Sequence, residues 1–263
     1  YPSISASAIL SEALQIPASS AISFLKIKGN YAEVGNGAPP YSFGNTFTPQ
    51  AAYGGNSVFT TSRTIADPNL TNERTRAYEA GIDLRFFGDR LRFDATYYNM
   101  LSFDQVINLP VGASSGYDFI TTNGGEISNK GVEIFLAARP VQTADFYWDV
   151  TLNFGRNRAI VESLPDVVTS GRYSIVADLF PGDEGGADLE FVAEEGELLG
   201  QLYGLGFQRV PDGQFEGQII HQNGLPQITT DKVSAGSYQP DFRAGVYNTL
   251  SYKNLSLGFL FDG

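Results

Sequence analysis

The sequence has few of the residues on which most enzyme chemistry depends. It contains no cysteine, one histidine, one methionine and one tryptophan among 263 residues. The absence of cysteine excludes disulfides, thiol catalysis and zinc sites built on thiolates. His221 is the only imidazole base that a serine triad could use, and no Gly-x-Ser-x-Gly segment is present to expose a serine nucleophile. We therefore predict no catalytic residue, no metal site built on histidine and no enzyme activity.

Charged residues and long apolar runs are also scarce. Charged side chains make up 17% of the chain, and 29 acidic against 17 basic residues give a net charge of −12. Because nucleic-acid binding depends on clustered Lys and Arg, this balance argues against a nucleic-acid partner. No apolar run reaches about 18 residues, which excludes a transmembrane helix. No basic n-region followed by an apolar h-region comes after Tyr1, so we expect no signal peptide in these residues.

The abundant residues indicate strands. The chain contains 19 Phe, 14 Tyr and 29 Gly, a mixture typical of all-β proteins. Apolar and polar residues alternate most clearly over 91–103, directly after the hairpin signal Phe87-Gly88-Asp89-Arg90. The same period predicts about ten strands of roughly 8 to 13 residues. Their predicted ranges are 4–10, 24–34, 78–86, 91–103, 132–139, 146–154, 199–210, 215–221, 242–250 and 255–261.

The connections between these predicted strands alternate in length. Short ones fall at 12–21, 87–90, 140–145, 211–214 and 252–254, and long ones at 35–74, 104–129, 159–198 and 222–240. An antiparallel up-and-down meander with all short turns at one end produces this order. It is typical of a transmembrane β-barrel wall with short periplasmic turns and long extracellular loops. Phe86, Phe87 and Trp148 at the short turns fit an interfacial girdle, with core aromatics at strand ends as the alternative.

Charged and polar side chains occupy the second face of these strands. In a barrel this face would contact a plug or line the substrate path, whereas on a soluble sheet it would meet water. We favour the lumen of a barrel. The residues are Glu79, Asp83, Arg85, Arg92, Asp94, Glu133, Arg139 and Asp149.

The long loop 159–199 holds ten acidic residues and one basic residue, Arg172. Its carboxylates have irregular spacing, with Gly182, Gly185 and Gly186 between them, so that a structural Ca²⁺ is a weak possibility beside an ordinary solvated loop. We assign no metal site and no cofactor. Gly204-Leu205-Gly206 opens no predicted helix, so it is not a dinucleotide fingerprint. The carboxylates in question are Asp178, Asp183, Glu184, Asp188 and Glu190.

Several segments resemble SusC/RagA-type TonB-linked outer-membrane proteins, which are TonB-dependent transporters. Residues 24–36 resemble a family strand that ends in Gly-Asn, here Gly35-Asn36. Asp67-Pro68-Asn69-Leu70 with Glu73, followed by Gly81-Ile82-Asp83, is similar to the family's Asn-Pro-Asn-Leu-x-x-Glu…Gly-Leu-Asp segment. Asn129-Lys130-Gly131-Val132-Glu133 is similar to its Asn-Lys-Gly-(Ile/Val)-Glu motif, and Pro240-Asp241-Phe242 with Ser251-Tyr252-Lys253-Asn254 is similar to a late segment. The matches run in family order.

The resemblance implies that residues 1–263 form part of a TonB-dependent receptor β-barrel domain. They would supply fewer than half the strands, from the middle and later part, of a larger barrel of about 22 strands. We expect no plug domain, TonB-interacting box or final strands in these residues. The wall would lie in the lipid of the outer membrane of a Gram-negative bacterium.

The resemblance also implies a function and partners. The family imports large nutrients, oligosaccharides or peptides, with energy from TonB, and a SusD-like surface lipoprotein acts as a lid. Contacts to TonB would come from parts outside these residues, and the ligand-binding residues are unknown. Two alternatives remain open, a soluble secreted or surface β-sandwich that binds glycans, and a passive porin. A sandwich would bury Phe93, Tyr97, Leu136, Val150 and Leu152 against a second sheet, whereas a barrel would turn them toward lipid.

Overall fold

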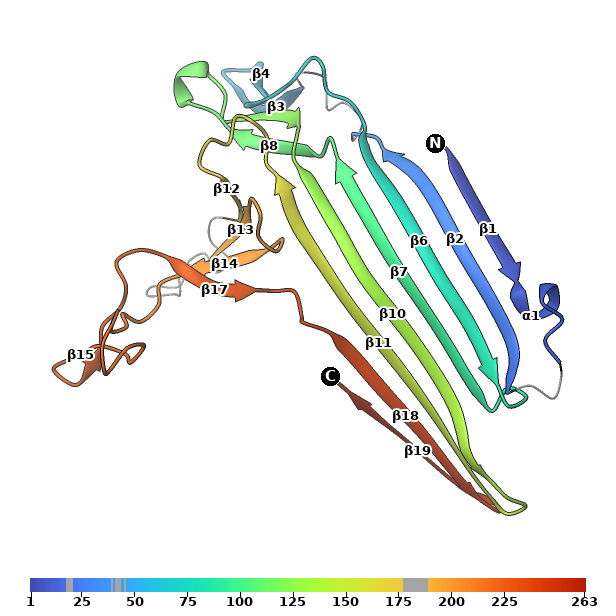
Figure 1. The fold of residues 1–263 in the computed structure, drawn as a ribbon. Coiled ribbons are helices and arrows are strands. Elements are labelled where there is room, and N and C mark those ends of the chain that lie inside the picture. The colour runs from blue at the N-terminus through green and yellow to red at the C-terminus, as the bar shows by residue number, and fades with distance from the viewer. Residues whose placement is uncertain (18–20, 39, 41–43, 45, 177–188) are drawn as a thin grey trace. The chain divides into compact units, whose positions relative to one another are not determined.

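The fold consists almost entirely of strands (Figure 1). The computed structural model describes residues 1–17, 21–38, 40, 44, 46–176 and 189–263. The chain forms two compact units, one made of Tyr1–Asn157 with Asp241–Gly263 and the other of Arg158–Pro240. In the described part of the chain, neither helical segment has the length and apolarity needed to cross a membrane.

The first unit is built on one antiparallel sheet of eight strands, which we call the wall. The strands lie side by side in the order β1-β2-β6-β7-β10-β11-β18-β19 (Figure 1). Each strand therefore pairs with the next wall strand along the chain, which confirms the predicted up-and-down meander. The bounds are β1 (Ser3–Ile9), β2 (Ile22–Asn36), β6 (Glu73–Phe86), β7 (Leu91–Phe103), β10 (Glu126–Gln142), β11 (Phe146–Ser163), β18 (Arg243–Tyr252) and β19 (Leu255–Asp262).

Short and long connections alternate along the wall. Short ones follow β1, β6, β10 and β18, and long ones follow β2, β7 and β11. In the turn after β6, Phe87, Gly88 and Asp89 take left-handed φ values of 53°, 62° and 68°, which allow the chain to reverse within four residues. The smaller elements of this unit are α1 (Leu10–Ala13), β3 (Phe47–Tyr53), β4 (Asn56–Thr61), β5 (Thr64–Ala66), β8 (Val106–Pro110), η1 (Ala113–Ser115) and β9 (Phe119–Asn123).

Two of the ten predicted strands do not belong to the wall, which has eight in the described residues. The predicted strands 199–210 and 215–221 lie in the second unit, inside one long connection between β11 and β18. Gly200 and Gly217 have φ values of 81° and 79°. Of the predicted range 199–210 only Gln201–Gly204 forms a strand, and the left-handed Gly217 breaks the predicted range 215–221, so most of both ranges is irregular.

The second unit carries its own four-stranded antiparallel sheet, in the order β12-β13-β14-β17. Val192 is fully buried, and Val161 is 1% exposed. These residues give the unit a small core of its own. The bounds are β12 (Arg172–Val176), β13 (Glu190–Glu194), β14 (Gln201–Gly204) and β17 (Val233–Ser237), with a separate hairpin of β15 (His221–Gln222) and β16 (Leu225–Pro226).

Candidate functional site

The wall gathers all eight predicted polar residues on one side, which we call the polar face. Asp83 lies opposite Asp94 in the strand register, and Arg85 lies opposite Arg92. Glu133 lies opposite Thr96, and Glu79 opposite Tyr98. Arg139 bonds Asp149 across β10 and β11. Since side chains alternate along each strand, this register brings the charged residues onto one side, where Phe135 and Ala137 of β10 also lie.

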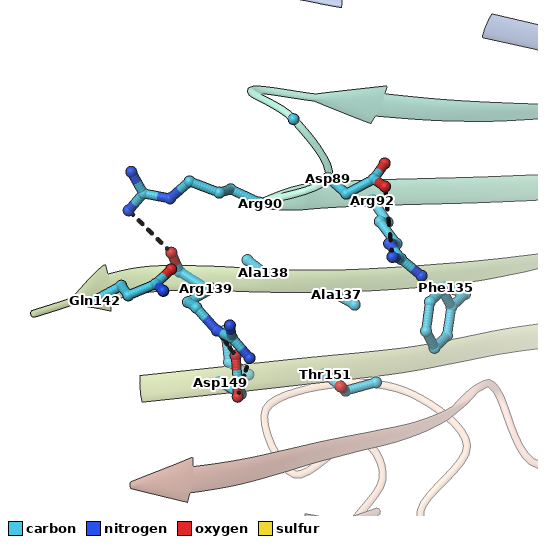
Figure 2. A pocket seen from close by; sticks show the side chains of 12 residues that line it. Asp89, Arg90, Arg92, Phe135, Ala137, Ala138, Arg139, Gln142, Asp149 and Thr151 are labelled. Atoms are coloured by element: carbon cyan, nitrogen blue, oxygen red, sulfur yellow. Dashed lines mark hydrogen bonds and ion pairs between the residues drawn. The ribbon is translucent and has the colours of Figure 1, made fainter. Parts of the chain in front are cut away.

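Near the short turns the polar face holds a hollow of about 450 Å³ (Figure 2). The Arg139 guanidinium donates two hydrogen bonds to the Asp149 carboxylate, at 2.6 and 2.9 Å. Arg90 donates to the backbone carbonyl of Arg139 at 3.3 Å, and Arg92 lies 3.7 Å from Asp89. The hollow thus presents fixed guanidinium and carboxylate groups. Such groups can bind and orient polar segments through charge-assisted hydrogen bonds.

The opposite side of the wall, which we call the apolar face, carries aliphatic and aromatic side chains. From the row Ile82–Ala95–Ile134 down to the short turns it has no charged residue in the eight described strands. Asn248 is its polar exception, and this residue is 8% exposed and accepts a hydrogen bond from Trp148 Nε1 at 3.1 Å. The described residues leave the apolar face uncovered, since Tyr97 is 52% exposed.

Aromatic residues mark both ends of this apolar band. Tyr31 and Tyr78 pack at 5.0 Å toward the long loops, and Phe146 lies opposite Tyr252 beside a short turn. From Tyr78 to Phe86 the strand rises eight steps, or roughly 27 Å along its axis at about 3.4 Å per residue. Transmembrane barrels have an apolar band about 25 Å tall between aromatic girdles. Charges on this face begin at this end of the band, where Lys130 lies in the row of Tyr78 and Asn99, and Arg76 and Glu33 stand just beyond Tyr78.

At the long-loop end, one asparagine joins three segments. The Asn123 amide accepts from the Thr71 N–H at 2.6 Å and donates to the carbonyls of Thr71 and Asp104 at 2.9 and 2.8 Å. Glu73 accepts from the Val106 N–H at 2.9 Å and from Asn36 Nδ2 at 3.1 Å. Glu73 belongs to a motif that the sequence reveals, whereas no sequence pattern indicates Asn123. Only the register of β9 brings Asn123 to this position.

A salt bridge closes the neighbouring loop. Arg63 Nε and Nη2 donate to Asp118 at 2.5 and 2.6 Å, and the Asp118 N–H donates to the Arg63 carbonyl at 2.7 Å. The hydrogen bond from Arg63 lowers the pKa of the Asp118 carboxyl below its ordinary value, against a smaller opposing effect of burial. These bonds hold together the two chain segments that lead into β5 and β9.

The second unit holds its strands together with polar side chains. The Gln239 amide accepts from the Ala159 N–H at 2.9 Å and donates to the carbonyls of Ala159 and Leu199, both at 2.8 Å. The Tyr203 hydroxyl donates to Glu194, and this hydrogen bond, with burial second, raises the pKa of Tyr203. The Gln239 side chain therefore hydrogen-bonds two backbone segments, as the backbone of a neighbouring strand would.

Those of the other candidate residues that the structure describes lie in the second unit. His221 is exposed in the β15–β16 hairpin, where Nδ1 lies 2.9 Å from the Ile219 carbonyl. Gly204 ends β14, and the Gly206 N–H donates to Thr229 Oγ1 at 3.0 Å. Glu190 forms an ion pair with Lys232 at 3.6 Å. The other acidic-loop residues, Asp178, Asp183, Glu184 and Asp188, lie outside the described residues.

No group of three or more His, Asp or Glu side chains within the described ranges is arranged to hold a metal ion. The Ca²⁺ possibility concerns residues beyond those ranges and stays a prediction. So do the expectations of no cofactor and no nucleic-acid partner.

A meander with one charged face and one exposed apolar band is the wall of a transmembrane β-barrel. The family model for the TonB dependent receptor-like β-barrel matches residues 20–259. The chain belongs to this family, whose members are receptors and transporters rather than enzymes. The prediction of no enzyme activity agrees with that membership.

Two relatives and one solved structure illustrate the similarity. The chain is 29% identical to TonB-dependent receptor P3 of Formosa agariphila over 93% of its own length and 26% of the relative's. It is 25% identical to TonB-dependent receptor SusC of Bacteroides thetaiotaomicron, over 86% and 22%. A structure of the RagAB peptide transporter matches with a TM-score of 0.76 and 20% identity, over 99% of this chain and 28% of that one. The chain thus spans about a quarter of the length of these relatives.

These findings confirm the SusC/RagA-type resemblance and exclude the sandwich alternative. Phe93, Leu136, Val150 and Leu152 are only partly covered, and Tyr97 is exposed. A second sheet packed on this face would bury them. Among the described residues, no side chain of this band joins the buried hydrophobic core.

Proposed function

We propose that residues 1–263 are part of the barrel domain of an outer-membrane importer that takes up large nutrients with energy from TonB. The plug domain, the TonB contact and the remaining strands would be supplied by sequence outside these residues. The barrel wall would perform no covalent chemistry. It would supply a passage and an inner surface that holds the plug.

The observation that carries this proposal is the separation of charge between the two faces of the same strands. In β6, Asp83 and Arg85 lie on the polar face, while Ile82 and Leu84, which alternate with them, lie on the apolar face. A charge that faces lipid near the bilayer midplane costs about 2–4 kcal/mol. Such a sequence is stable in a bilayer only when the polar face meets water or protein inside a barrel.

We propose oligosaccharides or peptides as the nutrients and a SusD-like surface lipoprotein as the partner at the long loops. The support is family membership together with the relatives, one of which is SusC and one the RagAB peptide transporter. Guanidinium and carboxylate groups in the polar-face hollow suit both cargo classes, since they bind hydroxyls as well as peptide groups.

The proposal is tested with the full-length protein in its host. Cell fractionation is expected to place it in the outer membrane, with a SusD-like lipoprotein in the purified complex. Cells that carry the gene are expected to take up labelled oligosaccharide or peptide pools, and deletion of TonB is expected to abolish this uptake. Recovery as a soluble periplasmic protein would refute the proposal. Uptake that persists without TonB would indicate a passive porin instead.

A further inference from the structure

Two glycines on the polar face lie beneath long side chains that cross from one neighbouring strand to the other. Gly81 is in β6 and Gly131 in β10, and each belongs to a segment that combines glycine, a β-branched residue and an acid, Gly81-Ile82-Asp83 and Gly131-Val132-Glu133. Neither glycine has a positive φ. Their backbone would accept any residue, and what distinguishes them is the space that a missing Cβ leaves.

Lys28 crosses the wall at Gly81. Lys28 in β2 lies opposite Gly81 in the register, and its Nζ bonds Asp94 on β7, the strand beyond, at 3.2 and 3.4 Å. A Cβ at Gly81 would overlap Lys28 Cε and would lie 3.0 Å from the Ala95 carbonyl oxygen. The lysine chain thus occupies the space that a side chain at position 81 would fill.

Tyr98 crosses the wall at Gly131 in the same way. Tyr98 in β7 lies opposite Gly131 in β10, and its hydroxyl donates to Asn157 Oδ1 on β11, the strand beyond, at 2.8 Å. A Cβ at Gly131 would overlap the Tyr98 hydroxyl and would lie 2.6 Å from the Arg156 carbonyl oxygen. Each crossing therefore joins two strands that are not hydrogen-bonded neighbours.

From these two crossings we propose that Gly81 and Gly131 are positioning residues of the polar face. They hold Lys28 and Tyr98 flat against the wall, so that the ammonium group and the phenol ring stay out of the passage. The inference rests on the proposed function in that the polar face is the lumen. With a side chain at position 81, Lys28 loses its path to Asp94, and its amine stands free on the polar face.

The test of the Lys28 crossing measures how fast its amine is acetylated. Full-length protein in liposomes is treated with a membrane-impermeant acetylating reagent, and the Lys28 peptide is quantified by mass spectrometry. Gly81→Ala is expected to raise the rate about threefold, which corresponds to the loss of an exposed ion pair. Asp94→Asn should raise it similarly, because it removes the partner and leaves Gly81 intact.

Gly155→Ala is the matched control. Gly155 also lies on the polar face without a positive φ, and none of the described atoms comes within 4 Å of its Cβ position. In this variant the Lys28 amine should be acetylated at the wild-type rate. A wild-type rate in Gly81→Ala would overturn the proposal for Lys28. Because acetylation requires no import, a failure of the proposed function would leave this result unaffected.

The Tyr98 crossing is tested by a double-mutant cycle in urea. Tyr98→Phe and Asn157→Ala each remove one partner of the same hydrogen bond. The unfolding constant of the double variant is expected to lie about fivefold below the product of the two single effects. Additive effects would overturn the proposal for Tyr98.

Discussion

The wall and the second unit, Arg158–Pro240, bury apolar surface in opposite ways. In the second unit Val161 is 1% exposed and Val192 is fully buried. In the wall the apolar face stays open, with Leu257 59% and Tyr97 52% exposed. The second unit has the interior of a water-soluble protein, whereas the wall is complete only when lipid covers it.

This difference shows which interactions stabilise each region. The wall depends on strand pairing and on a membrane, since polar backbone groups in lipid must be paired within the sheet. The second unit depends on a small core and on polar side chains such as Gln239. Substitutions should therefore affect the two regions separately, and they should respond to different solvents.

The largest effect is expected from a charge on the apolar face. Ile82→Arg places a guanidinium near the middle of the apolar band, which should destabilise the full-length protein in liposomes by about 3 kcal/mol. The gel mobility of folded protein after incubation in urea measures this. Thr151→Arg on the polar face is the control and should change stability by no more than about 0.5 kcal/mol. Equal effects of the two substitutions would contradict the assignment of faces.

A cavity in the second unit should act on that unit alone. Val192→Ala removes two buried methyl groups and should cost about 2 kcal/mol. Limited proteolysis should then cut within 158–240 faster, while the wall keeps its gel mobility in urea. Val167→Ala is the control, because Val167 is 63% exposed. Loss of the wall's resistance in Val192→Ala would show that the two units do not unfold independently.

Removal of the Gln239 amide should have a somewhat smaller effect. Gln239→Ala leaves the carbonyls of Ala159 and Leu199 without this donor, at a cost of about 1.5 kcal/mol. Hydrogen exchange at the Ala159 amide should accelerate, whereas exchange in β7 should not change. Gln222→Ala, at an exposed position of β15, should leave both unchanged. Unaltered protection at Ala159 would refute the role given to Gln239.

The smallest effect is expected from pH at the Arg63–Asp118 pair, where both side chains are largely exposed. Because the folded-state pKa of Asp118 is lowered, its stabilisation is fully present above the unfolded pKa of about 3.9. It is lost as the pH falls through the folded-state pKa. The protection factor of the Asp118 amide should therefore stay constant from neutral pH to about pH 5 and decrease below about pH 4. Asp118→Asn should remove this dependence, and an unchanged dependence in that variant would assign the titration to another group.

Sequence patterns predicted the short-turn ends of the wall strands well. The predicted range 91–103 coincides with β7, and β11 begins at Phe146 as expected. At the long-loop ends β6 extends back to Glu73 and β10 to Glu126. There both faces are polar, and so the alternation disappears while the backbone pairing continues. The apolar–polar alternation is expected only where one face of the strand meets lipid, so it ends where the strand leaves the membrane.

The candidate site was predictable as a surface but not as a set of contacts. Alternation alone placed Asp83, Asp94 and Glu133 on one face. The crossing of Gly131 by Tyr98 depends on the register of three strands, and sequence period cannot determine that register. Two ranges of the second unit were predicted as wall strands because a short alternating run does not reveal which strands it pairs with, and β14 pairs with β13 and β17.

The central claim, that the apolar face meets lipid and the polar face does not, can be measured directly along β7. The chain has no cysteine, so single cysteines at successive positions from Leu91 to Leu101 can each carry a spin label in full-length protein in liposomes. Oxygen, which concentrates in lipid, should reach labels at odd positions such as Phe93 and Tyr97. It should reach labels at even positions such as Asp94 and Thr96 much less. Equal oxygen access at odd and even positions, or the opposite alternation, would contradict the account.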